Sequence, residues 1–140
     1  MTLQTGFPLD ILAGKDQSNT GHQYDRVNAT GQATALARGS QDPQRFFNTS
    51  AYSLQPFGFY GNAGRNTLIG PGVINWDFST IKAVAFAERR TLEFRFEAFN
   101  LPNHPNWGSP NATFVSASFG RITSTSTNMR DLQFGLKLNF

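Results

Sequence analysis

The C-terminal segment of the chain, DLQFGLKLNF, alternates large apolar side chains with polar or small ones. Its apolar positions are Leu132, Phe134, Leu136, Leu138 and Phe140. A spacing of two residues is typical of a β-strand that has one apolar face and one polar face. The pattern therefore predicts a strand over residues 131–140, and it raises the question of what covers the apolar face.

Two segments further upstream carry the same alternation, NWDFSTIKAVAF at 75–86 and TLEFRFEAFN at 91–100. In the second segment, one face carries the apolar side chains Leu92, Phe94 and Phe96. The opposite face carries the charged side chains Glu93, Arg95 and Glu97. The short link Ala87–Arg90 between two alternating segments predicts an antiparallel β-hairpin.

The rest of the chain lacks this alternation. Residues 14–72 are polar and repeatedly interrupted by Gly, which is typical of loops. Residues 101–130 contain Pro102, Pro105 and Pro110, and each proline would remove a hydrogen-bond donor from a central strand. We therefore expect one all-β unit over the whole chain, with antiparallel strands joined by two long loops.

The apolar faces of these strands can be covered either by a protein core or by lipid. A soluble antiparallel sheet with its apolar face inward is the simpler interpretation. Strand length favours lipid, because a strand of about ten residues, rising about 3.3 Å per residue and tilted by about 40°, spans about 25 Å. That height equals the apolar band of an outer-membrane barrel.

Loop lengths and aromatic placement also favour lipid. The link Ala87–Arg90 is short and the next connection, 101–130, is long, and outer-membrane barrels combine short periplasmic turns with long outer loops. Aromatic girdles mark the ends of barrel strands, and the aromatic residues near the strand ends are Trp76, Phe86, Phe99 and Phe140.

These features predict the two faces of a barrel wall. The predicted lipid-facing residues are Leu92, Phe94, Phe96, Leu132, Phe134, Leu136 and Leu138. Glu93, Arg95 and Glu97 would face a water-filled lumen, where their alternating charges can pair.

Composition agrees with a β-rich protein. The chain has 140 residues, of which only 15% are charged and 14 are Phe, whereas about 25% charged residues is usual for soluble domains. The net charge of +3 comes from scattered basic residues, so we expect no nucleic-acid partner. There is no Cys, which excludes disulfides and thiolate metal sites. No apolar run of a length that spans a membrane as a helix occurs, and the N-terminus does not match a signal peptide.

Candidate chemistry is sparse. His22 and His104 are the only histidines, so a metal site would need carboxylates such as Asp16, Asp25 or Asp42 beside them. A loop role for both histidines is the simpler interpretation. Glu93 and Glu97 would lie about 13 Å apart along a strand, which is too far for a catalytic carboxylate pair. We expect no enzyme activity, no cofactor and no metal site.

Several stretches in combination resemble a known family. They are GNAGRNTLIGPGVINWDFSTIK, TLEFRFEAFNLPNHPNWGSPN, FGRITST and DLQFGLKLNF, together with the early TLQTGFPLDI and DRVNATG. The chain resembles the C-terminal end of TonB-dependent receptors, in particular Oar-like transporters, which often carry a carboxypeptidase-regulatory-like domain. The resemblance covers nearly the whole chain.

The resemblance implies a large outer-membrane barrel with an N-terminal plug, which moves a bulky substrate across the cell outer membrane with energy supplied through TonB. It also implies that Phe140, as the terminal aromatic residue, is recognised by the barrel-assembly machinery. The expected partners are outer-membrane lipid, the remainder of the barrel and that machinery.

The chain shows no signal peptide, plug or TonB box, so we expect it to be the C-terminal segment of a receptor and to meet TonB only through missing N-terminal parts. Too few strands are predicted to close a barrel, and an open sheet in lipid leaves edge groups unpaired.

The alternative is a soluble β-sandwich binding module for a carbohydrate or an adhesion partner. In that case exposed Trp76, Trp107 and Tyr60 would form the ligand platform. The apolar face over 132–140 would then have to pack against a second sheet. No second set of alternating strands is evident in residues 14–72.

Overall fold

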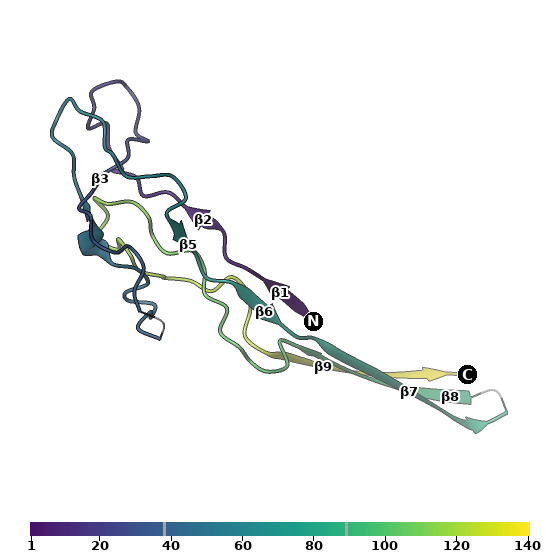
Figure 1. The fold of residues 1–140 in the computed structure, drawn as a ribbon. Helices are drawn as coiled ribbons and strands as arrows, with labels where there is room; N and C mark the ends of the chain where they lie inside the picture. Colours follow the sequence, from purple (N-terminus) through teal and green to yellow (C-terminus); the bar gives the residue numbers. More distant parts are fainter. Residues whose placement is uncertain (38, 89) are drawn as a thin grey trace. The chain divides into compact units, whose positions relative to one another are not determined.

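The computed structural model describes residues 1–37, 39–88 and 90–140, and its named strands pair antiparallel throughout (Figure 1). The predicted all-β, antiparallel architecture is confirmed. The helix among the described residues is a single 3-10 turn, η1 (Thr49–Ala51). Across the described part of the chain, no helix has the length and apolar character needed to cross a membrane.

Contacts between residues group the chain into two compact units. The sheet unit comprises Met1–Gln4, Val73–Asn106 and Thr127–Phe140. The loop unit comprises Thr5–Gly72 and Trp107–Ser126. The sheet unit contains the strands that the alternation predicted, and the loop unit contains most of the residues that were predicted as loops.

Three long strands form the main sheet of the sheet unit. They are β7 (Phe78–Ala87), β8 (Arg90–Phe99) and β9 (Asp131–Asn139), in the order β7-β8-β9 (Figure 1). Each strand overlaps one of the segments whose alternation predicted it. The predicted link between the first two strands includes Arg89, which lies outside the described residues.

A shorter strand, β6 (Val73–Asn75), precedes β7 and pairs antiparallel with β1 (Thr2–Gln4) (Figure 1). Leu3 and Ile74 are partners in this pair, and their side chains are 66% and 43% exposed. Exposed apolar side chains therefore continue beyond the start of β7.

The predicted strand 75–86 is interrupted at Trp76 and Asp77. The carboxylate of Asp77 accepts hydrogen bonds from Nδ2 of Asn75 (2.9 Å) and from the backbone N–H of Asn100 (2.9 Å). Short polar side chains that bond to the nearby backbone compete with the strand ladder. This competition explains why the strand restarts only after Asp77.

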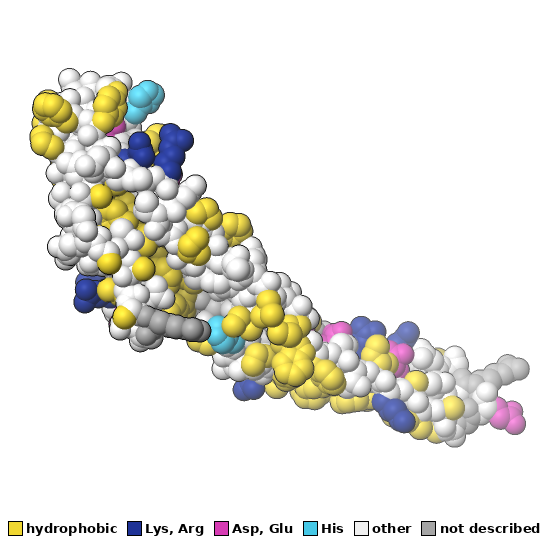
Figure 2. Space-filling view, in the orientation of Figure 1, with side chains coloured by type: hydrophobic (Ala, Val, Ile, Leu, Met, Phe, Trp, Pro, Cys, Tyr) yellow, Lys and Arg dark blue, Asp and Glu magenta, His cyan; other side chains and the backbone are white. Residues whose placement is uncertain are grey.

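The register of the main sheet gathers the apolar side chains on one face. Phe94 pairs with Leu136 and Phe96 with Phe134, and the rings of Phe96 and Phe134 lie with their centroids 5.0 Å apart. Cross-strand aromatic pairs of this kind stabilise a sheet by about 0.2–1 kcal/mol each. Figure 2 shows hydrophobic side chains gathered along this part of the chain.

The same register brings the cation Lys82 onto the apolar face, in the interior of β7. Lys82 pairs with Phe94, and its neighbours on the same face of β7 are Thr80 and Val84. The side chain of Lys82 is exposed. The sequence analysis did not predict Lys82 on this face, although the two-residue period that starts at Phe78 places it there.

The loop unit is built from very short strand pairs. β2 (Pro8–Leu9) pairs with β5 (Leu68–Ile69), and β3 (Asn28–Ala29) pairs with β4 (Tyr52–Ser53). Backbone hydrogen bonds between loops, such as the Leu12 N–H to the carbonyl of Ala112 at 3.0 Å, add to these short ladders, and side chains must also hold this unit together.

A core of single apolar residues does so. Ile11, Val27 and Phe47 are fully buried, and the Phe47 ring makes an edge contact with Phe119 at 5.2 Å. Such ring pairs contribute about 0.5–1.5 kcal/mol beyond burial of their area. The segment predicted as the loop 14–72 is therefore more ordered than expected, because isolated apolar residues without any period meet in three dimensions.

Candidate functional site

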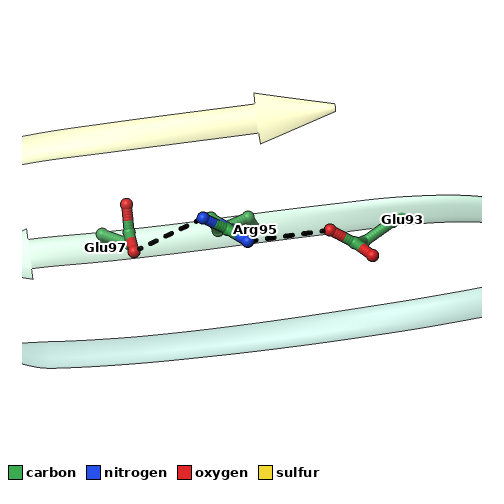
Figure 3. A network of polar contacts seen from close by, with 3 residues as sticks. All are labelled: Glu93, Arg95 and Glu97. Atoms are coloured by element: carbon green, nitrogen blue, oxygen red, sulfur yellow. Dashed lines mark ion pairs between the residues drawn. The ribbon is translucent and has the colours of Figure 1, made fainter. Parts of the chain in front are cut away.

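The polar face of the main sheet carries a row of alternating charges on β8. The guanidinium of Arg95 lies between the carboxylates of Glu93 and Glu97, with N···O distances of 4.0 Å to each (Figure 3). The side chains of Arg95, Glu93 and Glu97 are 48%, 30% and 24% exposed. The three charged side chains therefore share one face of β8, their ion pairs are long and open to solvent, and contact of this face with a lumen stays a prediction.

A groove of about 330 Å³ runs over this polar face. It lies where Gly135 pairs with Arg95 and Glu93 pairs with Lys137 across the β8–β9 ladder. The missing side chain at Gly135 leaves space beside the guanidinium. The groove therefore offers both signs of charge to water or to a polar solute.

The apolar face opposite this groove is open. Phe134 is 66% exposed and Leu136 is 71% exposed, so no described residue covers them. Burying a Leu or Phe side chain stabilises a folded protein by about 1.5–3 kcal/mol. The side chains of this face gain that stabilisation only if lipid or other protein covers them. All seven predicted wall residues share the face, and contact of this face with lipid stays a prediction.

At the other end of the sheet unit, a buried amide satisfies the edge of β6. Asn106 is 1% exposed, and its Oδ1 accepts the N–H of Ile74 at 2.8 Å while its Nδ2 donates to the carbonyl of Ile74 at 3.0 Å. Nδ2 also donates to Oγ1 of Thr127 at 2.8 Å. The side chain of Asn106 thus replaces a paired strand.

A second amide closes the connection between β8 and β9. Asn100 adopts φ of 50°, a left-handed conformation that Asn tolerates better than most residues. Its Nδ2 donates to the carbonyls of His104 and Asn128, both at 3.1 Å, and its Oδ1 accepts the N–H of His104 at 3.0 Å. The start and end of the long connection are therefore fixed to each other.

A shallow pocket of about 320 Å³ lies beside these amides. It is lined by Asn75, Asp77, Phe99, Asn100, Thr127, Asn128, Met129 and Asp131. The carboxylate of Asp77 is already engaged by Asn75 and Asn100. The pocket therefore has a polar lining whose groups serve the loop structure.

The metal site that was considered at the sequence level has little geometric support. Within the described residues, no three His, Asp or Glu side chains come together to hold a metal ion. Asp16 instead accepts the backbone N–H groups of Thr20 and Gly21 at 3.0 and 2.8 Å. His104 contacts Asn106, with Nδ1 and Oδ1 3.1 Å apart. Both groups hold loops.

Asp25 is a buried loop carboxylate whose acidity is changed by its hydrogen bonds. The backbone N–H of Ser18 donates to its Oδ2, and this bond holds the pKa of Asp25 below its usual value. Burial opposes the change, and the Ser18 hydroxyl and the nearby His22 support it. The carboxylate of Asp25 therefore stays ionised and anchors the loop that begins at Gln17.

The terminal aromatic Phe140 follows β9 directly and is 92% exposed. Its proposed role as an assembly signal needs such an accessible side chain.

The sequence analysis missed two features of this unit, the buried Asn106 and the position of Lys82 on the apolar face. Alternation predicted which residues share a face of the sheet because their period is local, whereas the partners of Asn106 are distant in sequence.

Comparison with known proteins matches the chain to a protein family. The family model described as Outer membrane beta barrel domain matches residues 1–133. No curated protein and no solved structure matches the chain.

Proposed function

Because the chain belongs to the family of outer membrane β-barrel domains and is located in the outer membrane, we propose that it forms the C-terminal wall segment of a TonB-dependent, Oar-like receptor. The parent protein would move a bulky substrate across the outer membrane with energy supplied through TonB. The chain itself has a structural role in this proposal, without enzyme activity or a cofactor.

The two-faced main sheet is the observation that carries this proposal. Phe134 and Leu136 stand exposed on one face, while Glu93 and Arg95 line a charged groove on the other. A barrel wall needs this asymmetry, because lipid covers the outside and water fills the inside. A soluble sandwich would need a second sheet over Phe134 and Leu136, and their exposure leaves the alternative without support.

The partners follow from the same faces. Lipid would cover the apolar face, and the remainder of the barrel would pair with the free edges of β7 and β9, since an open edge in lipid costs several kcal/mol per unpaired group. The barrel-assembly machinery would recognise Phe140. TonB would bind only N-terminal parts of the receptor.

Detergent partition of lysine variants tests the assignment of the faces. Gln133 and Phe134 are adjacent on β9 and point to opposite faces. We expect the chain to enter the detergent phase. Phe134→Lys should reduce this partition strongly, since a lysine on the lipid face costs about 2–4 kcal/mol at mid-depth, and Gln133→Lys should not. Equal effects of both variants, or a monodisperse monomer that melts cooperatively in plain buffer, would contradict the proposal.

The receptor assignment needs its own test. Intact receptor from outer membranes should copurify with the periplasmic domain of TonB, whereas the 140-residue chain should not. Deletion of Phe140 from the intact receptor should lower its amount in the outer membrane without changing TonB binding. Binding of TonB to the chain itself would contradict the proposal that TonB binds only N-terminal parts of the receptor.

A further inference from the structure

Lys82 places a cation in the interior of β7, on the apolar face of the main sheet. It pairs with Phe94 on β8, and Leu136 follows in the same row on β9. The carboxylates of the sheet lie elsewhere, because Glu93 and Glu97 are on the opposite face and pair with Arg95. Among the described residues, no ion pair engages Lys82.

The depth of Lys82 makes this placement costly. Each strand residue contributes about 2.5 Å of height when the rise is about 3.3 Å and the tilt about 40°. Lys82 is five positions from Ala87, the end of β7, which corresponds to about 13 Å. Lys82 therefore lies inside the apolar band, which is about 25 Å tall, at a depth where a lysine is strongly disfavoured.

The shorter route to a polar environment leads toward the link between β7 and β8. In the other direction, exposed apolar side chains continue past Phe78 to Ile74, which is eight positions or about 20 Å from Lys82. A lysine stem reaches about 6 Å toward the surface. About 7 Å then remains on the link side, a gap that membranes close by local thinning and by moving headgroups inward.

We infer that the ammonium of Lys82 binds the phosphate of phospholipid headgroups and draws the link-side leaflet inward beside β7. Phosphate supplies the missing counter-charge, and the exposed side chain is free to reach it. The result is a thinned strip of bilayer along β7. This inference rests on the proposed function, because it requires lipid on the apolar face.

Two detergents with the same alkyl chain isolate the phosphate. Dodecylphosphocholine carries a phosphate in its headgroup, and dodecyl maltoside does not. The full chain contains no Cys, so Val84→Cys or Leu132→Cys provides a unique attachment point for a polarity-sensitive fluorophore. Val84 is the next residue on this face toward the link, and Leu132 lies two rows away as a matched control.

We expect the label at position 84 to shift to bluer emission in phosphocholine micelles when Lys82→Met is introduced, because headgroups withdraw. Lys82→Arg should keep the redder emission, since a guanidinium also binds phosphate. In maltoside the difference between the Lys82 and Lys82→Met chains should shrink, and the label at position 132 should not change.

Two results would overturn the inference in distinguishable ways. An equal shift in both detergents, or no shift in either, would show that phosphate is not the partner while leaving the lipid-facing wall intact. Emission typical of water from both label positions in all samples would overturn the lipid-facing wall as well.

Discussion

The side-chain amide of Asn106 pairs with the backbone of Ile74 as a neighbouring strand would. Its Oδ1 accepts the Ile74 N–H at 2.8 Å and its Nδ2 donates to the Ile74 carbonyl at 3.0 Å. Each buried backbone polar group needs such a partner. The side chain of Asn106 thus satisfies the backbone of β6, which lies beyond the end of the ladder between β7 and β8.

Replacing this amide should therefore be expensive. Asn106→Ala leaves both polar groups of Ile74 without their partner, and we expect a total loss of about 1–3 kcal/mol in the free energy of unfolding, because both bonds are part-buried. Denaturant-induced unfolding in detergent micelles measures this loss in the free energy of unfolding. Asn139→Ala, at the exposed end of β9, should change stability by less than about 0.5 kcal/mol. Equal losses for both variants would contradict this role of Asn106.

Two glycines should respond in opposite ways to a methyl group. A Cβ at Gly61 would overlap the carbonyl oxygens of Arg26 and Val27, so Gly61→Ala should cost about 1–3 kcal/mol. A Cβ at Gly135 would lie 3.6 Å from Cβ of Arg95, an ordinary contact. Gly135→Ala should therefore stabilise the strand by about 0.5–1 kcal/mol, and thermal unfolding of both variants distinguishes these signs.

The loop unit should lose stability in acid because of Asp25. The folded pKa of Asp25 is lowered, chiefly by the Ser18 N–H, from its usual 3.8. The stabilisation is therefore complete above the unfolded pKa and is lost as pH falls from about 4 through the lower folded pKa. A ¹³C titration of the carboxyl group reads the pKa, and thermal unfolding between pH 2 and pH 7 reads the stability.

Asp25→Asn should flatten this acid dependence. Asp131 serves as the control, because its carboxylate accepts no hydrogen bond from the described residues, and Asp131→Asn should leave the dependence unchanged. Stability that falls equally steeply below pH 4 in the Asp25→Asn chain would assign the acid sensitivity to another group.

The charged row on β8 should contribute little to stability. Arg95 is 4.0 Å from both carboxylates and about half exposed, and open ion pairs contribute about 0–1 kcal/mol. We expect Arg95→Gln to lower the free energy of unfolding by less than about 1 kcal/mol at low salt, and by less still at high salt. Lys137→Gln is the matched control on β9. A loss above about 2 kcal/mol would mean that the row is desolvated.

Alternation predicted the strands and the residues that share each face of the sheet. Leu132, Phe134 and Leu136 fall on one face of β9 because side chains of a strand alternate whatever the strand packs against. The break at Asp77 was not predicted, since it depends on a hydrogen bond to Asn100, which the chain brings close only after β8 has folded back.

The alternation of apolar and polar residues also did not predict the order within the loop unit. Phe47 meets Phe119 although 72 positions separate them (119 − 47), and neither lies in an alternating segment. Glycines that gave residues 14–72 their loop character permit close approaches there, as at Gly61 beside Arg26. Local composition reports backbone freedom, and it does not report which distant side chains will pack.

The amino-acid pattern alone predicts antiparallel strands with one apolar and one polar face, because a period of two residues is a local property of the extended chain. Folding sets the remaining features of the sheet. It set Lys82 opposite Phe94 through the strand register, and it placed Asn106 against the edge of β6 through a connection whose ends are far apart in sequence. Both placements depend on which residues become neighbours, and these neighbours are set only once the chain has folded.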